Sequence, residues 1–205
     1  MKLYYKAGAC SLSPHIALIE AGLPFTIEAV DLATKRTASG ADYKAVNPRG
    51  YVPALQLDNG AVLTEGAAIV QYIADLAPEK KLAPANGTFE RTRLQEWLNF
   101  ISTELHKGIS PNYNPNLDAA AKAVFNARFV ASLEWLEGEL KGTYLMGDTF
   151  TIADGYLFNV LLWPKGVGVD ISKFTKLQAY FERVRNRPSV QQAMQEEGLI
   201  NKAAA

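Results

Sequence analysis

Segments with strand character all lie in the first third of the chain, and this division limits the possible folds more than any other feature. A short apolar run covers residues 3–5, residues 25–31 alternate apolar with polar, and two further apolar segments flank residues 58–60. Beyond about residue 82 only helical patterns follow. Residues 77–88 carry two prolines, a glycine and several charges, which is typical of a linker. We therefore predict two domains, residues 1–80 and 88–205.

The first domain is expected to combine strands and helices. Ser13 precedes Pro14 as a capping residue would, and helical apolar residues continue to Gly22, which predicts a helix over 14–21. The Asn59-Gly60 pair between two apolar segments predicts a β-hairpin. Thr64 is expected to cap a helix that extends to about residue 76. The predicted order of elements is βαβαββα, an α/β arrangement.

The second domain is expected to be all-α. Thr151 and Asp154 have the spacing of a capping box, in which the two side chains satisfy amides at a helix start. This box serves folding and not catalysis. The helices are predicted over residues 90–109, 118–140, 151–162, 173–186 and 189–197.

The charge balance excludes several functions. Among the 205 residues, Lys and Arg total 21 and Asp and Glu total 21, so the formal net charge is zero. Such a chain has no summed field to hold it on nucleic acid or on an anionic membrane. No apolar run approaches the roughly 20 residues of a membrane span, and the first residues lack a signal-peptide pattern. We expect a cytoplasmic protein with no nucleic-acid or membrane partner.

The single cysteine, Cys10, lies between the first strand and the first helix. Alone it can form neither an intramolecular disulfide nor a multi-thiolate metal site, so no metal is expected. The start of a helix stabilises an anion and lowers the pKa of a thiol. Without a second cysteine, turnover through Cys10 needs an external thiol, for which glutathione is the candidate. The alternative is an inert, packed cysteine, which the small and polar neighbours disfavour.

Four further segments, taken with Cys10, resemble the landmarks of the Cys-containing beta class of bacterial glutathione S-transferases. They are residues 47–55, 63–69, 104–108 and 150–154, and their order and spacing agree with that family over nearly the whole chain. The resemblance implies a thioredoxin-like domain followed by an all-helical domain. It also implies a detoxifying transferase that joins glutathione, its co-substrate, to a small hydrophobic electrophile, and it implies a homodimer.

The resemblance also assigns roles to individual residues. It implies catalytic roles for Cys10, His106 and Ser11, and glutathione binding by Cys10, Lys35, Val52, Pro53, Glu65, Gly66, Asn99, Thr103, Glu104, His106 and Lys107. Val52 would pair its main chain with the tripeptide, and Pro53 would be a cis proline. Glu65 and the amide of Gly66 would hold the γ-glutamyl end. Lys35 would meet the glycine carboxylate as a mobile charge.

The remaining assignments concern the helical domain. His106 would hydrogen-bond a sulfur or carry protons. Asn99, Thr103 and Glu104 share a helical face, and in the family such positions reach glutathione bound to the neighbouring subunit. An aromatic set would line the electrophile pocket or form plain helical core. Its members are Tyr113, Phe158, Trp163 and Phe181.

Two alternative functions stay open at this stage. The first is a glutathione-dependent thiol-disulfide oxidoreductase or peroxidase that acts through Cys10. The second is a ligand-binding protein of the same fold without turnover. His15 has no evident partner in the sequence, and we expect it to be structural.

Overall fold

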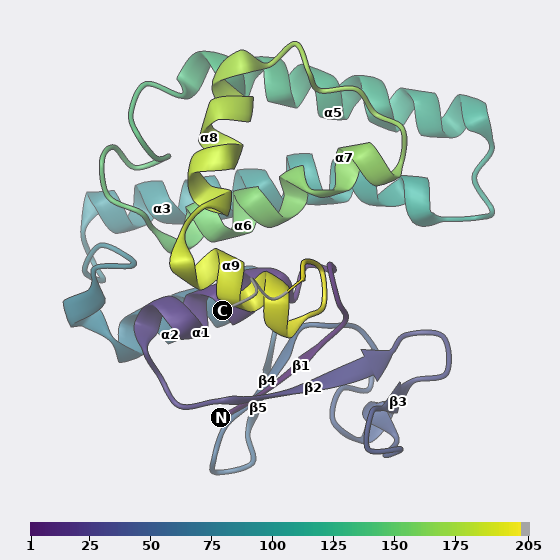
Figure 1. Cartoon of the computed structure of the whole chain (residues 1–205), viewed down its shortest axis with the longest axis vertical. Coiled ribbons are helices and arrows are strands. Elements are labelled where there is room, and N and C mark those ends of the chain that lie inside the picture. Colours follow the sequence, from purple (N-terminus) through teal and green to yellow (C-terminus); the bar gives the residue numbers. More distant parts are fainter. Residues whose placement is uncertain (202–205) are drawn as a thin grey trace. The chain divides into compact units, whose positions relative to one another are not determined.

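The computed structural model describes residues 1–201, which form two compact units. The first unit contains residues 1–83 together with residues 186–201, and the second contains residues 84–185. Figure 1 shows the strands gathered in the first unit and only helices and loops in the second. No helix among the described residues has the length and apolar character needed to cross a membrane.

The first unit is built on a five-stranded mixed sheet with the order β3-β2-β1-β4-β5. Strand β1 pairs in parallel with β2, and the other neighbouring pairs are antiparallel. Helices α1 and α2 pack against each other. This architecture confirms the predicted thioredoxin-like fold. The bounds are β1 Lys2–Tyr5, α1 Leu12–Ala21, β2 Thr26–Asp31, β3 Arg36–Thr37, β4 Ala54–Gln56, β5 Val62–Thr64 and α2 Gly66–Leu76.

The predicted hairpin is present between β4 and β5. The amide of Leu57 donates to the carbonyl of Ala61, and the amide of Gly60 donates to the carbonyl of Leu57. Gly60 has a φ of 86°, which closes a three-residue loop that few other residues could form.

The second helix of the predicted βαβαββα order is not formed as an α-helix. Strand β3 and the short 3₁₀ helix η1, Tyr43–Ala45, occupy the segment between β2 and β4. The side chains explain the difference, because Asp31 accepts hydrogen bonds from the amide of Ala33 and the hydroxyl of Thr34. Asp42 accepts from the amide of Lys44 in the same way. Such local bonds favour turns over helix.

The first helix also begins earlier than predicted. Helix α1 starts at Leu12, with Ser11 at the capping position, so Ser13 lies inside the helix. The Ser13 side chain is buried, and its hydroxyl has no hydrogen-bond partner among the described residues. The prediction that Ser13 caps this helix is therefore wrong. Gly22 ends the helix in a left-handed conformation, as expected.

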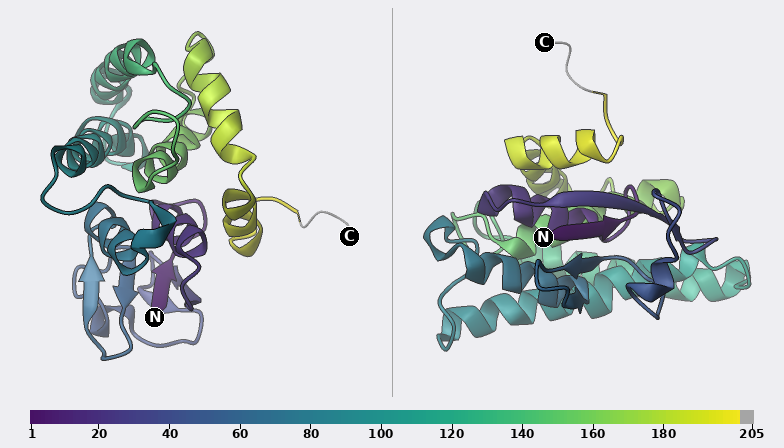
Figure 2. Two further views of the ribbon diagram at one scale, coloured as in Figure 1. Left: turned by 90° about the vertical axis from the view of Figure 1, so that its left-hand side faces the viewer. Right: turned by 90° about the horizontal axis from the view of Figure 1, so that it is seen from below.

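The last helix, α9 (Pro188–Glu196), belongs to the first unit and not to the helical one. It packs against α1, and Figure 2 shows the two helices side by side. The compact units therefore differ from the predicted division at residues 88–205. Sequence patterns identify a helix here but contain no information about which neighbour covers its apolar face.

The second unit contains only helices and loops within its described residues. Its main helices are α3 Phe89–Phe100, α5 Ala119–Glu139, α6 Ile152–Leu161 and α8 Thr175–Arg185, and its short ones are η3 Ile101–His106, α4 Lys107–Ile109, η4 Ser110–Tyr113 and α7 Trp163–Gly166. The predicted capping box is present, and Asp154 accepts a hydrogen bond from the amide of Thr151 at 2.8 Å. The short helix α7 was not predicted.

The predicted helix over residues 90–109 is interrupted. Segment η3 is a π-helix, in which the amide of Lys107 donates to the carbonyl of Ser102, five residues earlier. Single π turns within longer helices are frequent at functional sites.

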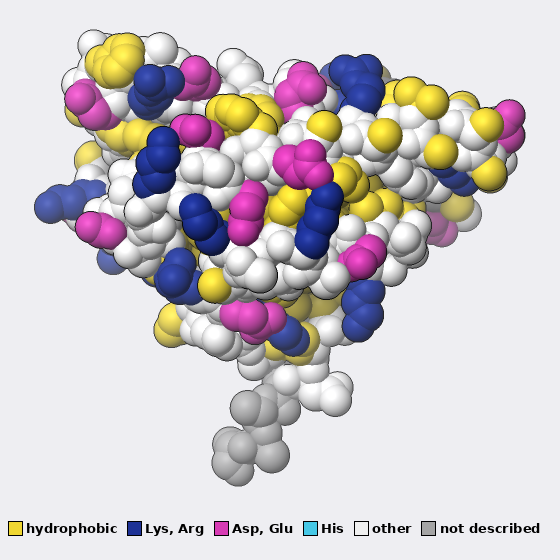
Figure 3. All heavy atoms as spheres, turned by 90° about the horizontal axis from the view of Figure 1, so that it is seen from above, with side chains coloured by type: hydrophobic (Ala, Val, Ile, Leu, Met, Phe, Trp, Pro, Cys, Tyr) yellow, Lys and Arg dark blue, Asp and Glu magenta, His cyan; other side chains and the backbone are white. Residues whose placement is uncertain are grey.

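Lys and Arg side chains alternate with Asp and Glu on the face drawn in Figure 3, in keeping with the net charge of zero.

Candidate functional site

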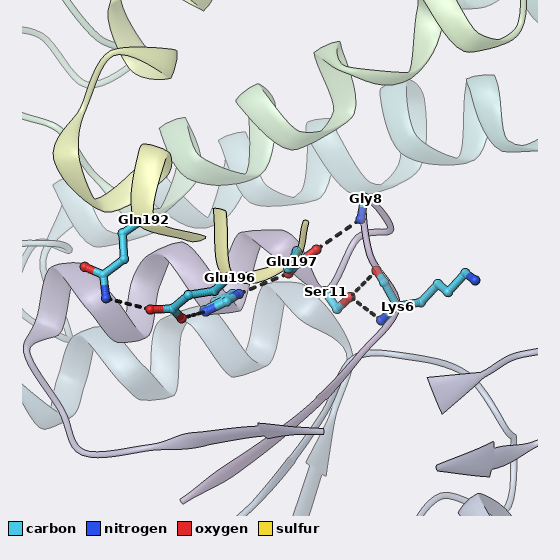
Figure 4. Close-up of polar contacts among 7 residues, drawn as sticks. Lys6, Gly8, Ser11, Gln192, Glu196 and Glu197 are labelled. Carbon is cyan, nitrogen blue, oxygen red and sulfur yellow. Dashed lines mark hydrogen bonds and ion pairs between the residues drawn. The ribbon is translucent and has the colours of Figure 1, made fainter. Parts of the chain in front are cut away.

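The loop between β1 and α1 carries Cys10 and is closed by hydrogen bonds of its own. The amide of Ala9 donates to the carbonyl of Lys6 at 2.9 Å, and Gly8 turns the chain with a φ of 69°. The hydroxyl of Ser11 accepts from the amide of Lys6 and donates to the carbonyl of Lys6 (Figure 4). The loop thus delivers Cys10 just ahead of the first turn of α1, where amides at the helix start favour an anion.

The loop bonds give Ser11 a structural role. Ser11 is fully buried, and its hydroxyl hydrogen is donated to Lys6 at 3.2 Å. A hydroxyl has one hydrogen to donate, so in this arrangement Ser11 does not donate to a sulfur. These bonds support a role for Ser11 in closing the loop, and its catalytic role stays a prediction.

Cys10 and Val52 lie together. The thiol of Cys10, which is partly exposed and forms no disulfide among the described residues, donates to the carbonyl of Val52 at 3.3 Å. The peptide bond between Val52 and Pro53 is cis, which confirms the state predicted for Pro53. The predicted thiol and the predicted tripeptide-binding segment are thus neighbours within one unit.

Two side chains that sequence reasoning missed hold the residue before Val52. The carbonyl of Tyr51 accepts hydrogen bonds from the hydroxyl of Tyr43 and from Nδ2 of Asn47, both at 2.7 Å. Tyr43 is fully buried, and burial raises its pKa to about 12. The hydroxyl therefore keeps its proton and remains a donor. Nothing in the local pattern of residues 43–51 predicts this convergence.

Glu65 and Gly66 lie at the start of α2. Glu65 has a φ of 66°, and its carboxylate pairs with Nη1 of Arg49 at 2.6 Å, although both side chains are largely exposed. A side chain at Gly66 would meet only Cγ of Pro53, at an ordinary 3.8 Å. Space for a side chain therefore exists at Gly66. Arg49 was not among the predicted site residues.

Lys35 is held more firmly than the mobile charge that was predicted. Its Nζ donates to the carbonyl of Gly50 at 3.0 Å, and its backbone has a φ of 57°. The ammonium also lies 5.7 Å from the ring centre of Tyr51. Lys35 therefore stands beside the segment that leads into Val52.

In the second unit, His106 is oriented by two aromatic residues. Its Nδ1 is 2.7 Å from the hydroxyl of Tyr156, and the ring of Trp163 is 4.9 Å away in an edge-on arrangement. Tyr156 is buried on α6 and was not predicted. A hydrogen bond at Nδ1 fixes the orientation of the imidazole, whichever of the two groups donates.

The other predicted residues of this unit are exposed around the π-helix. Asn99, Thr103, Glu104 and Lys107 all lie at the surface of the chain. The Thr103 hydroxyl donates to the carbonyl of Asn99 at 3.0 Å and approaches the carboxylate of Glu104 at 3.4 Å. The Thr103 hydroxyl thus bonds the main chain of Asn99 and the side chain of Glu104, and the glutathione-binding roles of these residues stay predictions.

The aromatic set divides between core and surface. Phe158 is fully buried and stacks on Phe181 with ring centres 5.0 Å apart, which is ordinary helical core. Tyr113 is exposed, and Trp163 contacts His106. No group of three or more potential metal-binding side chains occurs within residues 1–201.

Comparisons with known proteins agree with this geometry. The family model for the glutathione S-transferase N-terminal domain matches residues 7–76, and the model for the C-terminal domain of the same family matches residues 100–188. The chain is 46% identical over 200 residues to "Glutathione S-transferase GstA" of Escherichia coli O157:H7, which covers 97% of this chain and 100% of that protein.

Solved structures give the same result. The bacterial glutathione S-transferase BphK, solved as a ternary complex, is 56% identical with a TM-score of 0.95 and covers 97% of this chain and 100% of its own. The bacterial beta-class enzyme of Sphingomonas chungbukensis is 46% identical with a TM-score of 0.94 and covers 98% and 100%. The chain therefore belongs to the bacterial glutathione S-transferase family, as the beta-class resemblance predicted, and is a glutathione transferase with glutathione as its co-substrate.

Proposed function

We propose that this enzyme joins the sulfur of glutathione to small hydrophobic electrophiles, with the tripeptide held on the edge formed by Val52 and its sulfur beside Cys10. The observation that carries the proposal is the 3.3 Å hydrogen bond from the Cys10 thiol to the Val52 carbonyl. It supports a site in which a tripeptide paired with the main chain of Val52 has its own sulfur next to Cys10 and the start of α1.

The ends of the tripeptide would be held by groups of opposite charge. The exposed carboxylate of Glu65 binds the γ-glutamyl ammonium, and the amide of Gly66 at the start of α2 binds the γ-glutamyl carboxylate. Arg49, which pairs with Glu65, orients that carboxylate. Lys35 attracts the glycine carboxylate from the neighbouring loop. The roles of Glu65, Gly66 and Lys35 are those predicted from the sequence, and the role of Arg49 is added to them.

The bond changes in the proposed reaction are simple. The thiol of glutathione gives its proton to solvent or to His106, and the thiolate attacks the electrophilic carbon. A carbon–sulfur bond forms, and for a chlorinated substrate chloride leaves with the bonding electrons. The predicted contributions of His106, Lys107, Asn99, Thr103 and Glu104 remain part of this proposal, as do a homodimer and a cytoplasmic location.

Cys10 offers a second reaction, which the partly exposed thiol beside Val52 favours. Its thiolate attacks the disulfide of oxidised glutathione, forms a mixed disulfide with one half and releases the other half as a thiolate. This exchange needs no second cysteine in the chain.

The test measures conjugation and exchange in parallel. Wild-type protein is assayed with glutathione and chlorodinitrobenzene, and separately for release of glutathione from its disulfide. Replacing Cys10 by Ala should abolish exchange and leave conjugation. Cys10→Ser is the matched control, because its hydroxyl can keep the hydrogen bond to Val52. Absence of conjugation with any of a panel of electrophiles, together with no calorimetric binding of glutathione, would disprove the proposal.

A further inference from the structure

The Cys10 loop receives a hydrogen bond from the opposite end of the chain. Oε2 of Glu197 accepts from the amide of Gly8 at 3.0 Å, although the two residues are 189 positions apart in the sequence. Figure 4 shows Glu197 reaching the loop from the segment that follows α9. A Cβ atom at Gly8 would lie 3.4 Å from Leu199, so the same segment also packs against the loop.

The carboxylate of Glu197 is itself fixed by the first helix. Its side chain is 0% exposed, and Oε1 lies 3.1 Å from Nδ1 of His15, which is also fully buried. His15 is on α1, the helix that begins just after Cys10. A buried carboxylate is tolerated only where partners compensate for its lost hydration, and here His15 and the Gly8 amide do so.

The other side of His15 provides a useful contrast. Nε2 of His15 lies 2.8 Å from Oε2 of Glu196, and the side chain of Glu196 is 36% exposed. Gln192 donates to Oε1 of Glu196 from the preceding turn of α9. Glu196 therefore shares His15 with Glu197, and its ion pair with His15 and hydrogen bond from Gln192 join it to α1 and to α9.

The hydrogen bonds within the loop determine its conformation, whereas the hydrogen bond to Glu197 fixes the position of the loop relative to α1 and α9. The bonds between Ala9 and Lys6 and between Ser11 and Lys6 join residues of the loop to one another. The Glu197 carboxylate, in contrast, comes from a different element and bonds a residue two positions before Cys10. A charged acceptor makes a stronger hydrogen bond than a neutral one.

We propose that Glu197 is a positioning residue, which through Gly8 holds the Cys10 thiol at the start of α1 and beside the Val52 edge. Glu197, directly after α9, thereby contributes to the glutathione site although it lies near the other end of the chain. The inference deepens the proposed function, because it concerns the same thiol and the same edge.

A purely structural role for Glu197 would be to dock α9 on α1. The structure contains a second docking contact that allows this to be tested separately. Arg187, directly before α9, donates to the carboxylate of Glu20 on α1 at 2.8 Å, and the hydroxyl of Ser189 also donates to Glu20. Neither contact involves the loop. Arg187→Met therefore loosens α9 without removing the acceptor for Gly8.

The experiment compares Glu197→Ala with Arg187→Met and Glu196→Gln in the full chain. The rate of Cys10 alkylation by iodoacetamide is followed by mass spectrometry across pH, and because Cys10 is the single cysteine, each added mass reports this thiol. Thermal midpoints and the KM and kcat for glutathione conjugation are measured alongside.

We expect Glu197→Ala to slow alkylation at neutral pH by about fivefold, the effect of one lost hydrogen bond, and to raise the KM for glutathione. Glu197→Gln should restore much of the rate, since its amide oxygen can accept from Gly8. Arg187→Met and Glu196→Gln should lower the thermal midpoint while leaving alkylation unchanged.

Two results would overturn the inference. One is an equal change in alkylation for Arg187→Met and Glu197→Ala, and the other is wild-type alkylation in both Glu197 variants. If Glu197→Ala does not fold, Glu197→Met, which fills a similar volume without an acceptor for Gly8, is compared with Glu197→Gln, and equal alkylation in these two variants overturns the inference. Alkylation needs no glutathione, so it decides the role of Glu197 even if wild-type protein fails to conjugate an electrophile.

Discussion

Two fully buried carboxylates, Asp154 in the helical unit and Glu197 in the first unit, serve their surroundings in different ways. Asp154 accepts hydrogen bonds from the amides of Leu145 and Thr151 and from the hydroxyl of Tyr180, all within its own unit. Glu197 joins the end of the chain to the loop before Cys10. The hydrogen bonds of Asp154 stabilise the helical unit, whereas the hydrogen bond of Glu197 contacts the loop of the candidate site.

The comparison shows that burial of an acid does not by itself indicate function. Burial raises the pKa of Asp154, and the hydrogen bonds from Leu145, Thr151 and Tyr180 oppose that rise. A perturbed group of this kind is often taken as a sign of an active site. Here the partners of Asp154 lie at the start of α6, in the loop before it and on α8, which packs on α6, so Asp154 holds these parts of the fold together.

The largest effect is expected when Asp154 is replaced by Ala. The amides of Leu145 and Thr151 and the hydroxyl of Tyr180 would lose their acceptor inside the protein, which should lower the free energy of unfolding by about 3 kcal/mol or more. The midpoint of urea unfolding measures this loss. If the comparison holds, the Cys10 alkylation rate of the folded variant stays at the wild-type value.

Asp148→Ala is the matched control for Asp154. Asp148 is exposed and accepts a hydrogen bond from the Thr143 hydroxyl at 2.8 Å. Its loss should change the unfolding midpoint little, because water replaces the missing partner. A midpoint for Asp154→Ala as high as that of Asp148→Ala would show that the buried network contributes nothing special to the fold.

The sequence predicted one of these two acids and not the other, and the reason is physical. The role of Asp154 follows from its distance of three residues from Thr151, a local relation that a capping box makes visible. The role of Glu197 depends on Gly8 and His15, which lie at the other end of the chain. His15 was accordingly expected to be structural without a partner, and residues 189–197 were expected only to form a helix.

The site shows the same division between local and distant causes. Cys10, the hairpin at Gly60 and the cis state of Pro53 follow from local pattern or from the family resemblance. The supports of the Val52 edge, Tyr43 and Asn47, do not, because their hydroxyl and amide meet the Tyr51 carbonyl only after the chain has folded. The π turn over Ile101–His106 was likewise outside what helical periodicity can predict.

An intermediate effect is expected for Tyr43→Phe. This variant tests whether a buried hydroxyl of the first unit supports the Val52 edge. The change removes one of two donors to the Tyr51 carbonyl while Asn47 remains. We expect the KM for glutathione to rise about fivefold with little change in kcat, as one lost hydrogen bond of about 1 kcal/mol predicts. Steady-state kinetics with varied glutathione measures the change.

Tyr4→Phe is the control for Tyr43→Phe. Tyr4 is also buried, its ring centre is 5.5 Å from that of Tyr43, and its hydroxyl donates to Oε1 of Gln56 and not to the Val52 segment. Its loss should leave the KM unchanged. An equal rise in KM for both variants would mean that general loosening of this core, and not the Tyr51 carbonyl, accounts for the effect.

The smallest effect is expected for Glu28, an acid of the first unit that serves neither network. Hydrogen bonds from Lys2 at 2.8 Å and Ser39 at 2.6 Å lower its pKa to about 2 from the ordinary 4.5. The ionised carboxylate therefore stabilises the fold above pH 4.5, and this contribution is lost as the pH falls towards 2. We expect it to be about 0.5 kcal/mol, because the partners are near the surface.

Glu28→Gln should accordingly flatten the fall of the thermal midpoint between pH 5 and pH 2, measured by circular dichroism on both proteins. Lys2→Met should flatten it in part, since Lys2 makes the largest contribution to the lowered pKa. Alkylation of Cys10 at neutral pH should not change in either variant. A changed alkylation rate would mean that Glu28, like Glu197, helps to position the Cys10 thiol. The distinction between acids that stabilise the fold and acids that position the thiol would then fail within the first unit itself.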